Sequence, residues 1–175
     1  MANSLSDLSA IVCTNLPMST TAPLKLLLIE DDAGIGSTVE HAVPDYGFEI
    51  VIKQTMRGAL HWLHDHRPDA ILLDLMLPDS LSAQSIDSIR LLRRYAPVWV
   101  ISGEGDDVIW DAVKEAGAAG WSQKPMIKLD ILAEELTEII RRDKLDKALK
   151  EQSARALECA HKIESLLTNG SVNGK

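Results

Sequence analysis

Residues 70–78 read Ala-Ile-Leu-Leu-Asp-Leu-Met-Leu-Pro, and this stretch decides how the chain folds. It opens with a short, wholly apolar run, and Asp74 follows directly. A run of this length and composition is typical of a parallel strand that helices cover on both faces. We therefore predict a buried strand over Ala70–Leu73 with a carboxylate at its end.

Similar short apolar runs stand on either side of this strand: Lys25–Ile29, Phe48–Ile52, Val98–Ile101 and a weaker one at Gly120–Ser122. Apolar residues recur about every 3.6 positions after each run, which predicts five helices. Their apolar faces are Ile35, Val39, Ala42 and Val43; Met56, Ala59, Leu60 and Leu63; Ile86, Ile89, Leu92 and the stem of Arg93; Val108, Ala112, Val113 and Ala116; and Ile131, Leu132, Leu136, Ile139 and Ile140.

Pro44 is expected to end the first helix, and Gly117 to cap the fourth. Five strands alternating with five helices over about 120 residues predict an open, doubly wound α/β sheet. In such sheets the ligand site lies beyond the carboxyl ends of the strands.

Composition narrows the classes of protein. The chain has 175 residues, of which 46% are apolar and 25% charged, as in ordinary globular proteins. A net charge of −8 argues against non-specific binding of nucleic acid, and no apolar run approaches the length of a membrane span. Cys13 and Cys159 offer neither a disulfide framework nor zinc-ligand spacing, so we predict a reducing, cytoplasmic setting.

Residues 1–23 contain no Lys or Arg and therefore lack the basic start of a secretory signal. They are rich in Ser and Thr, and we predict a flexible leader.

Polar side chains follow the apolar strands directly. Because the carboxyl ends of parallel strands meet at one edge of a sheet, these side chains should converge. They are Glu30, Asp31 and Asp32 after the first strand, Asp74 after the third, Ser102 after the fourth and Lys124 after the fifth.

Acids that lie this close repel one another unless a cation is present, and oxygen ligands of this kind suit Mg²⁺. With the ammonium of Lys124 and the hydroxyl of Ser102 nearby, one carboxylate is well placed to attack phosphorus and hold an acyl phosphate. Taken singly, Asp32 or Ser102 is as readily explained as a cap of the following helix. It is their joint placement at four strand ends that favours a phosphate site.

Four motifs together resemble the receiver domains of two-component response regulators. They are Leu-Leu-Leu-Ile-Glu-Asp-Asp at 26–32, the stretch at 70–78, Val-Ile-Ser-Gly at 100–103, and Ala-Gly-Ala-Ala-Gly-Trp-Ser-Gln-Lys-Pro at 116–125. The resemblance runs from about residue 24 to 142. It implies a flavodoxin-like five-stranded parallel sheet of order 2-1-3-4-5.

The resemblance also implies a role for each matching residue. Asp74 is the expected phosphoacceptor, and Mg²⁺ is held by Glu30, Asp31, Asp74 and the backbone carbonyl of Met76. Lys124 and Ser102 are expected to contact the phosphoryl group, and Trp121 to turn inward with Ser102. Pro125 is the candidate for a cis peptide bond.

Two departures from the family pattern stand out. Trp121 occupies a place where Tyr or Phe is usual. Residues 79–85 form a loop that is longer than usual and contains no Gly, which puts the shape of the region beside Asp74 in question.

Helical residues continue without Pro or Gly to Thr168, so we predict a helical extension over 143–168 and a flexible tail over 169–175. Its apolar positions follow steps of four and three, which is a heptad seam: Leu145, Leu149, Gln152, Ala156, Cys159, Ile163 and Leu166. The extension either dimerises or docks a partner, or it folds back as a single amphipathic helix. By contrast, His61, His64 and His66 lack the further ligands that a metal site needs.

The sequence thus predicts a stand-alone receiver, not an enzyme in its own right, that accepts phosphate from a histidine kinase or phosphotransfer protein. It would signal by protein contacts, including a homodimer through the face of helix four, strand five and helix five or through residues 145–166. The main alternative is a scaffold that uses the fold without phosphorylation. A Mg²⁺-dependent phosphatase is disfavoured because Met76 stands where a second acid is needed.

Overall fold

The computed structural model describes residues 22–80, 82–103, 107–124 and 128–169. Five strands form one parallel sheet of order β2-β1-β3-β4-β5, which confirms the predicted fold class. The strands are β1 (Leu24–Ile29), β2 (Phe48–Lys53), β3 (Ala70–Asp74), β4 (Val98–Ser102) and β5 (Gly120–Gln123).

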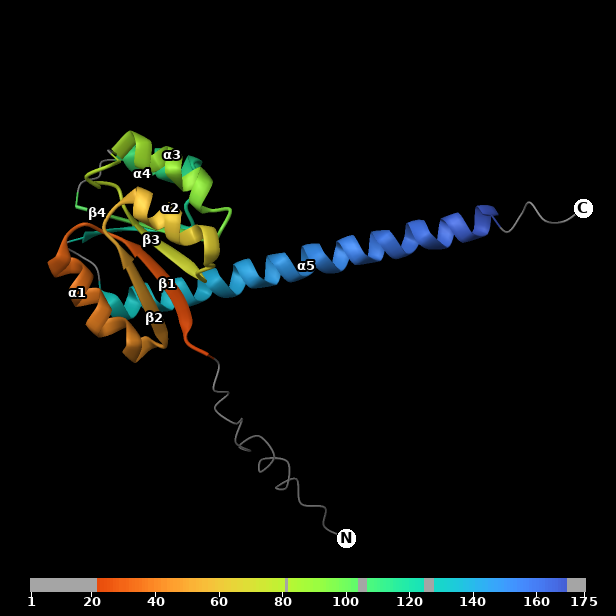
Figure 1. The fold of residues 1–175 in the computed structure, drawn as a ribbon, viewed down its shortest axis with the longest axis horizontal. Helices are drawn as coiled ribbons and strands as arrows, with labels where there is room; N and C mark the ends of the chain where they lie inside the picture. The colour runs from red at the N-terminus through yellow and green to blue at the C-terminus, as the bar shows by residue number, and fades with distance from the viewer. Residues whose placement is uncertain (1–21, 81, 104–106, 125–127, 170–175) are drawn as a thin grey trace, which may run out of the picture.

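Helices cover both faces of the sheet, with α1 and α5 on one side and α2, α3 and α4 on the other (Figure 1). They are α1 (Ala33–Ala42), the 3₁₀ turn η1 (Val43–Tyr46), α2 (Met56–Asp65), α3 (Ser82–Leu92), α4 (Asp107–Glu115) and α5 (Leu129–Asn169). As predicted, α1 ends just before Pro44, whose ring is incompatible with a helix interior. Gly117 follows α4 with a φ of +90°, the left-handed conformation expected of a C-cap.

Two apolar cores hold the helices to the sheet. Alternate residues of β1 divide between them: Leu27 and Ile29 face α2, α3 and α4, whereas Leu26 and Leu28 face α1 and α5. Every residue of β3 and β4 is buried, as expected of central parallel strands. Each fully buried aliphatic side chain stabilises the fold by about 1.5–3 kcal/mol.

For two residues, the prediction that they lie on the inward face of their helix is wrong. Val108 is 75% exposed and Ile131 is 50% exposed. In α4 the inward stripe is Ile109, Val113 and Ala116, at steps of four and three, so Val108 lies to one side of it.

The weak apolar character of β5 is explained by Trp99, its neighbour on β4. Trp99 pairs with Gly120 in register, and a Cβ at Gly120 would lie only 2.2 Å from the indole ring. The indole Nε1 donates a hydrogen bond of 3.1 Å to Ser122 Oγ. Glycine and serine on β5 therefore make room for Trp99 and satisfy its donor.

Within the described residues, no helix combines the length and the apolar character needed to cross a bilayer. The predicted leader over residues 1–23 and the tail over 169–175 lie almost wholly outside the described residues, apart from 22–23 and 169.

Candidate functional site

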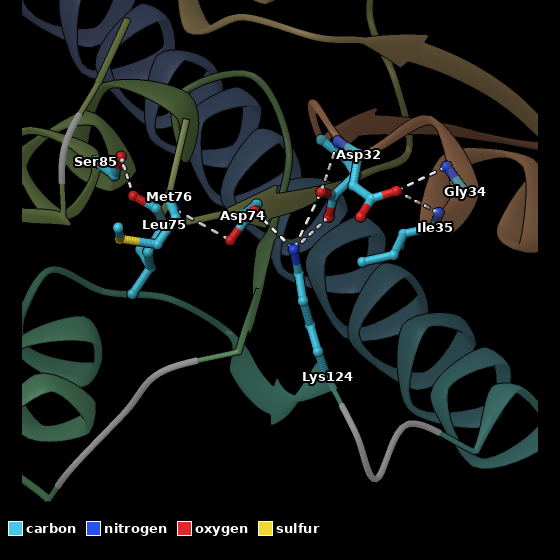
Figure 2. Close-up of polar contacts among 9 residues, drawn as sticks. Asp32, Gly34, Ile35, Asp74, Leu75, Met76, Ser85 and Lys124 are labelled. Atoms are coloured by element: carbon cyan, nitrogen blue, oxygen red, sulfur yellow. Dashed lines mark hydrogen bonds and ion pairs between the residues drawn. The ribbon is translucent and has the colours of Figure 1, made fainter. Parts of the chain in front are cut away.

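The carboxyl edge of the sheet brings acids and a lysine together, as Figure 2 shows. Lys124, directly after β5, places its Nζ 2.7 Å from Asp74 Oδ2 at the end of β3. The same Nζ lies 2.9 Å from Oε2 and 3.1 Å from Oε1 of Glu30, which follows β1. One ammonium thus links the first, third and fifth strands.

Burial raises the free-energy cost of charge on the two carboxylates. Glu30 and Asp74 are only 1% and 2% exposed. Burial raises the pKa of Glu30 and the charge of Asp74 adds to this, while the hydrogen bond from Lys124 opposes it. Burial alone would lower the pKa of Lys124, but its hydrogen bonds to Asp74 and Glu30 outweigh burial and raise it. Lys124 is therefore held as a cation between two carboxylates.

The donor set fits a divalent cation. Oxygens of Glu30, Asp31 and Asp74 lie within 4.8 Å of one another, and Asp31 is exposed to solvent. Glu30 Oε2 is buried and, although ion-paired with Lys124, accepts no well-aligned hydrogen bond from the described residues. A cluster of carboxylate oxygens that is partly open to water suits Mg²⁺, which keeps several of its waters.

Asp32 has a different task. Its Oδ1 accepts hydrogen bonds from the N–H groups of Gly34 at 2.7 Å and Ile35 at 3.2 Å, so it is the N-cap of α1. Its own N–H donates to Glu30 Oε1 at 3.1 Å, which helps to orient that carboxylate. The capping interpretation therefore holds for Asp32.

Ser102 is the buried last residue of β4, on the same edge as Asp74. The described part of α4 begins at Asp107, and residues 104–106 lie outside the described residues. Both interpretations of Ser102, as a helix cap and as a contact of the phosphoryl group, therefore remain predictions.

Trp121 lies on the outer side of β5, where its ring stacks on Trp110 of α4 with centroids 5.9 Å apart and planes at 16°. The described conformation is thus the outward one, and the inward turn stays a prediction. Pro125, and with it the predicted cis peptide, lies outside the described residues.

The loop after Asp74 is folded back on itself, a feature that the sequence did not reveal. The N–H of Met76 donates to Asp74 Oδ1 at 3.1 Å, and Leu77 pairs with Ser80 across a tight turn. Ser85 of α3 is fully buried, and its Oγ lies 3.0 Å from the carbonyl oxygens of both Leu75 and Ser80. Ser85 therefore holds the main chain at Leu75 and Ser80, on either side of Met76.

Ser85→Ala is expected to lower the free energy of unfolding by about 1–2 kcal/mol, because it removes the buried hydroxyl that donates to the carbonyl oxygen of Leu75 or Ser80. The same change should weaken Mg²⁺ binding, since the loop that carries Met76 loses its tether. Urea unfolding and Mg²⁺ titration measure both effects. Ser88→Ala, on the exposed side of α3, is the matched control, and an equal loss there would contradict this role for Ser85.

The same loop also caps α2. Asp79 accepts hydrogen bonds of 2.9 Å from the N–H groups of both Met56 and Arg57, the first two residues of the helix. Slight burial acts to raise the pKa of Asp79, but the hydrogen bonds from Arg57 and Met56 outweigh it and lower the pKa. The loop beside Asp74 is thereby tied to the first turn of α2.

Asp79→Ala should lower the free energy of unfolding by about 1 kcal/mol at pH 7. A carboxylate with a lowered pKa stabilises the fold above its unfolded pKa, near 3.8, and this contribution is lost as the pH falls through the folded pKa. The stability difference between wild type and variant should therefore shrink in acid, as urea titrations at several pH values would show. A constant difference would contradict the charge-dependent contribution.

His66, the residue directly after α2, packs against its own helix. His66 stacks on Trp62, with ring centroids 4.5 Å apart, and bonds to its carbonyl oxygen. The metal-capable cluster found among the described residues contains no histidine.

The fold agrees with comparisons to known proteins. The family model of the response regulator receiver domain matches residues 26–141. The chain belongs to this family.

Curated relatives include the transcriptional regulatory protein PrrA of Mycobacterium tuberculosis, 30% identical over 65% of this chain and 48% of the relative. The cell cycle transcriptional regulator CtrA of Caulobacter vibrioides is 26% identical over 69% of this chain and 52% of the relative. The chain thus spans about half the length of these relatives.

Among solved structures, a CheY-like receiver domain protein from Methanospirillum hungatei matches with a TM-score of 0.64 and 20% identity, covering 71% of this chain and 98% of that one. A response regulator from Burkholderia pseudomallei, solved with a phosphorylated aspartic acid and a calcium ion, matches with a TM-score of 0.59 and 19% identity over 73% and 74% of the two chains. At these identities the likeness supports the fold.

Proposed function

We propose that this chain is a phosphoacceptor switch of two-component signalling, which takes a phosphoryl group onto Asp74 from a phosphohistidine of a histidine kinase or phosphotransfer protein in the cytoplasm. The observation that carries the proposal is the buried Asp74 carboxylate at the end of β3, 2.7 Å from Lys124 and within an acidic cluster that fits Mg²⁺. An aspartate oxygen attacks phosphorus, the bond from phosphorus to the histidine nitrogen breaks, and that nitrogen leaves with the electron pair.

The surrounding residues would have two roles, holding Mg²⁺ and contacting the phosphoryl group. Glu30, Asp31, Asp74 and the Met76 carbonyl would hold Mg²⁺, which when bound neutralises charge on the transferred phosphoryl group. Lys124 would move from its ion pair with Asp74 toward the phosphoryl oxygens, and Ser102 would donate to them. The phosphorylated aspartate in the Burkholderia pseudomallei relative supports this chemistry.

The output would pass through the face of α4, β5 and α5. There the stacked pair of Trp110 and Trp121 is the element that an inward turn of Trp121 would have to break. Phosphorylation would thus bias which side chains this face offers to a partner. Because the acyl phosphate can transfer its phosphoryl group to water, slow autodephosphorylation is the most turnover that this site is expected to show.

The direct test is incubation of the full chain with Mg²⁺ and a small phosphodonor such as acetyl phosphate, followed by intact mass spectrometry. The expected result is the added mass of one phosphoryl group, which is lost on treatment with hydroxylamine because the linkage is an acyl phosphate. No added mass, or one that resists hydroxylamine, would overturn the proposal.

A scaffold that works without phosphate is the second candidate, favoured by the exposed leucines of the α5 extension. It predicts the same oligomer and the same partners with and without the phosphodonor. A phosphatase with an aspartyl nucleophile is disfavoured, because the exposed Met76 occupies the place of the second acid.

A further inference from the structure

Helix α5 continues far past the domain that it covers. Leu132, Leu136 and Ile140 pack on the sheet, and Lys144 then forms an ion pair of 2.6 Å with Asp69 at the other end of the sheet. Beyond that point α5 runs away from the domain as a single rod (Figure 1). Every described residue from Lys144 to Lys162 is exposed.

This rod carries an apolar seam on a defined side. Leu145 and Leu149 are 59% and 52% exposed. At 100° per residue they lie on the opposite side of α5 from Ile140, which faces the sheet. The domain that Ile140 anchors therefore cannot cover them.

The seam has the period of a coiled coil. Steps of four and three place Leu145, Gln152, Cys159 and Leu166 at d positions and Leu149, Ala156 and Ile163 at a positions. A repeat of 3.5 residues follows a second helix, whereas packing on a globular surface follows 3.6.

We propose that the seam of a second copy of this chain covers it, as a parallel two-stranded coiled coil over residues 145–166. The pairing does not depend on phosphorylation of Asp74 and goes beyond the proposed switch. It places the two receiver domains at the same end of the rod, each on the outer side of its own α5.

Charge favours the parallel arrangement. In parallel pairs a g position meets the e position five residues on in the other helix, which sets Arg141 against Asp146 of the second copy. Arg141 also pairs with Glu138 of its own helix and remains exposed, so its guanidinium is accessible to both carboxylates. The next two pairs, Ala148 with Ser153 and Arg155 with Ala160, contain no like charges.

An antiparallel pair sets g positions beside g positions. Depending on the register, Arg155 would then face Arg155 or Lys162 of the second copy, two cations in either case. Like charges at these positions act against pairing.

The chain offers a matched pair of variants for the test. Leu149 lies on the seam, whereas Leu157 is 60% exposed but lies at a b position, off the seam. Sedimentation equilibrium of the full chain is expected to give twice the mass of one chain. Leu149→Asp should raise the dissociation constant at least about 100-fold, because it removes two buried leucines per dimer, whereas Leu157→Asp should leave it nearly unchanged.

Whether the two helices are parallel can be tested with the native thiol of Cys159. In a Cys13→Ser background, mild oxidation should join two chains through Cys159, because a parallel dimer sets this exposed d position against itself. Cys159→Ser should abolish the product. In the same background, Asp74→Asn should dimerise and cross-link like wild type, so failure of this proposal is distinguishable from failure of phosphorylation.

A monomer at tens of micromolar, a three-chain mass, or equal effects of Leu149→Asp and Leu157→Asp would overturn the pairing. A dimer that does not cross-link at Cys159 would overturn the parallel orientation. Circular dichroism of both aspartate variants shows that loss of the dimer does not come from loss of the helix.

Discussion

Asp74→Asn is expected to abolish phosphorylation by Mg²⁺ and acetyl phosphate, taking the chain from a stoichiometric acyl phosphate to no detectable adduct. The amide has nearly the shape of the carboxylate but lacks the nucleophilic oxygen. Asp31 is exposed and Glu30 is engaged with Lys124, so neither should replace Asp74. Intact mass spectrometry measures the loss.

The variant is expected to remain folded, because replacing one of two buried carboxylates around Lys124 relieves their mutual repulsion. Asp32→Asn is the matched control, since asparagine is as good an N-cap as aspartate. It should keep both the fold and the phosphorylation. A wild-type level of adduct on the Asp74→Asn chain would place the acceptor elsewhere.

Lys124→Met is expected to lower the free energy of unfolding by about 2–3 kcal/mol in Mg²⁺-free buffer, because it leaves Glu30 and Asp74 as buried carboxylates without their shared cation. Methionine keeps most of the apolar stem, so the loss reports the ammonium. Millimolar Mg²⁺ should recover much of this stability if the acidic cluster binds the ion, as urea unfolding with and without Mg²⁺ would show.

Lys144→Met provides the comparison, because its ion pair with Asp69 is of similar length but more than half of the lysine side chain is exposed. It should cost less than about 1 kcal/mol and should not respond to Mg²⁺. Equal costs for the two variants, or no recovery of Lys124→Met by Mg²⁺, would contradict the description of this pocket as a cation site.

The sheet and the meeting of its polar strand ends could be predicted because both follow from short-range rules. Apolar runs such as Leu26–Ile29 and Ala70–Leu73 specify buried parallel strands, and parallel strands bring their carboxyl ends to one edge. Hence the sequence predicts that Glu30, Asp74 and Lys124 are neighbours. The sequence does not predict that Lys124 Nζ contacts both carboxylates, because these contacts depend on side-chain rotamers.

The interactions that were missed cross long stretches of sequence or depend on helix phase. Asp79 caps α2 some 20 residues earlier, and no local pattern signals that pairing. Val108 and Ile131 were placed inward because an aliphatic residue one position from the true stripe fits a 3.6-residue period almost as well. The stack of Trp110 on Trp121 joins two elements whose distance the sequence does not encode locally.

The unbroken course of α5 has a mechanical consequence. Its first turns lie against the sheet and its last turns stand free, without a proline or glycine to act as a hinge between them. From Lys144 to Asn169 the rod is about 39 Å long at 1.5 Å per residue. A tilt of about 5° where α5 rests on the sheet would displace the far tip by about 3 Å. The helix is therefore a rigid arm: a small change in its angle on the sheet becomes a much larger displacement of its C-terminal end.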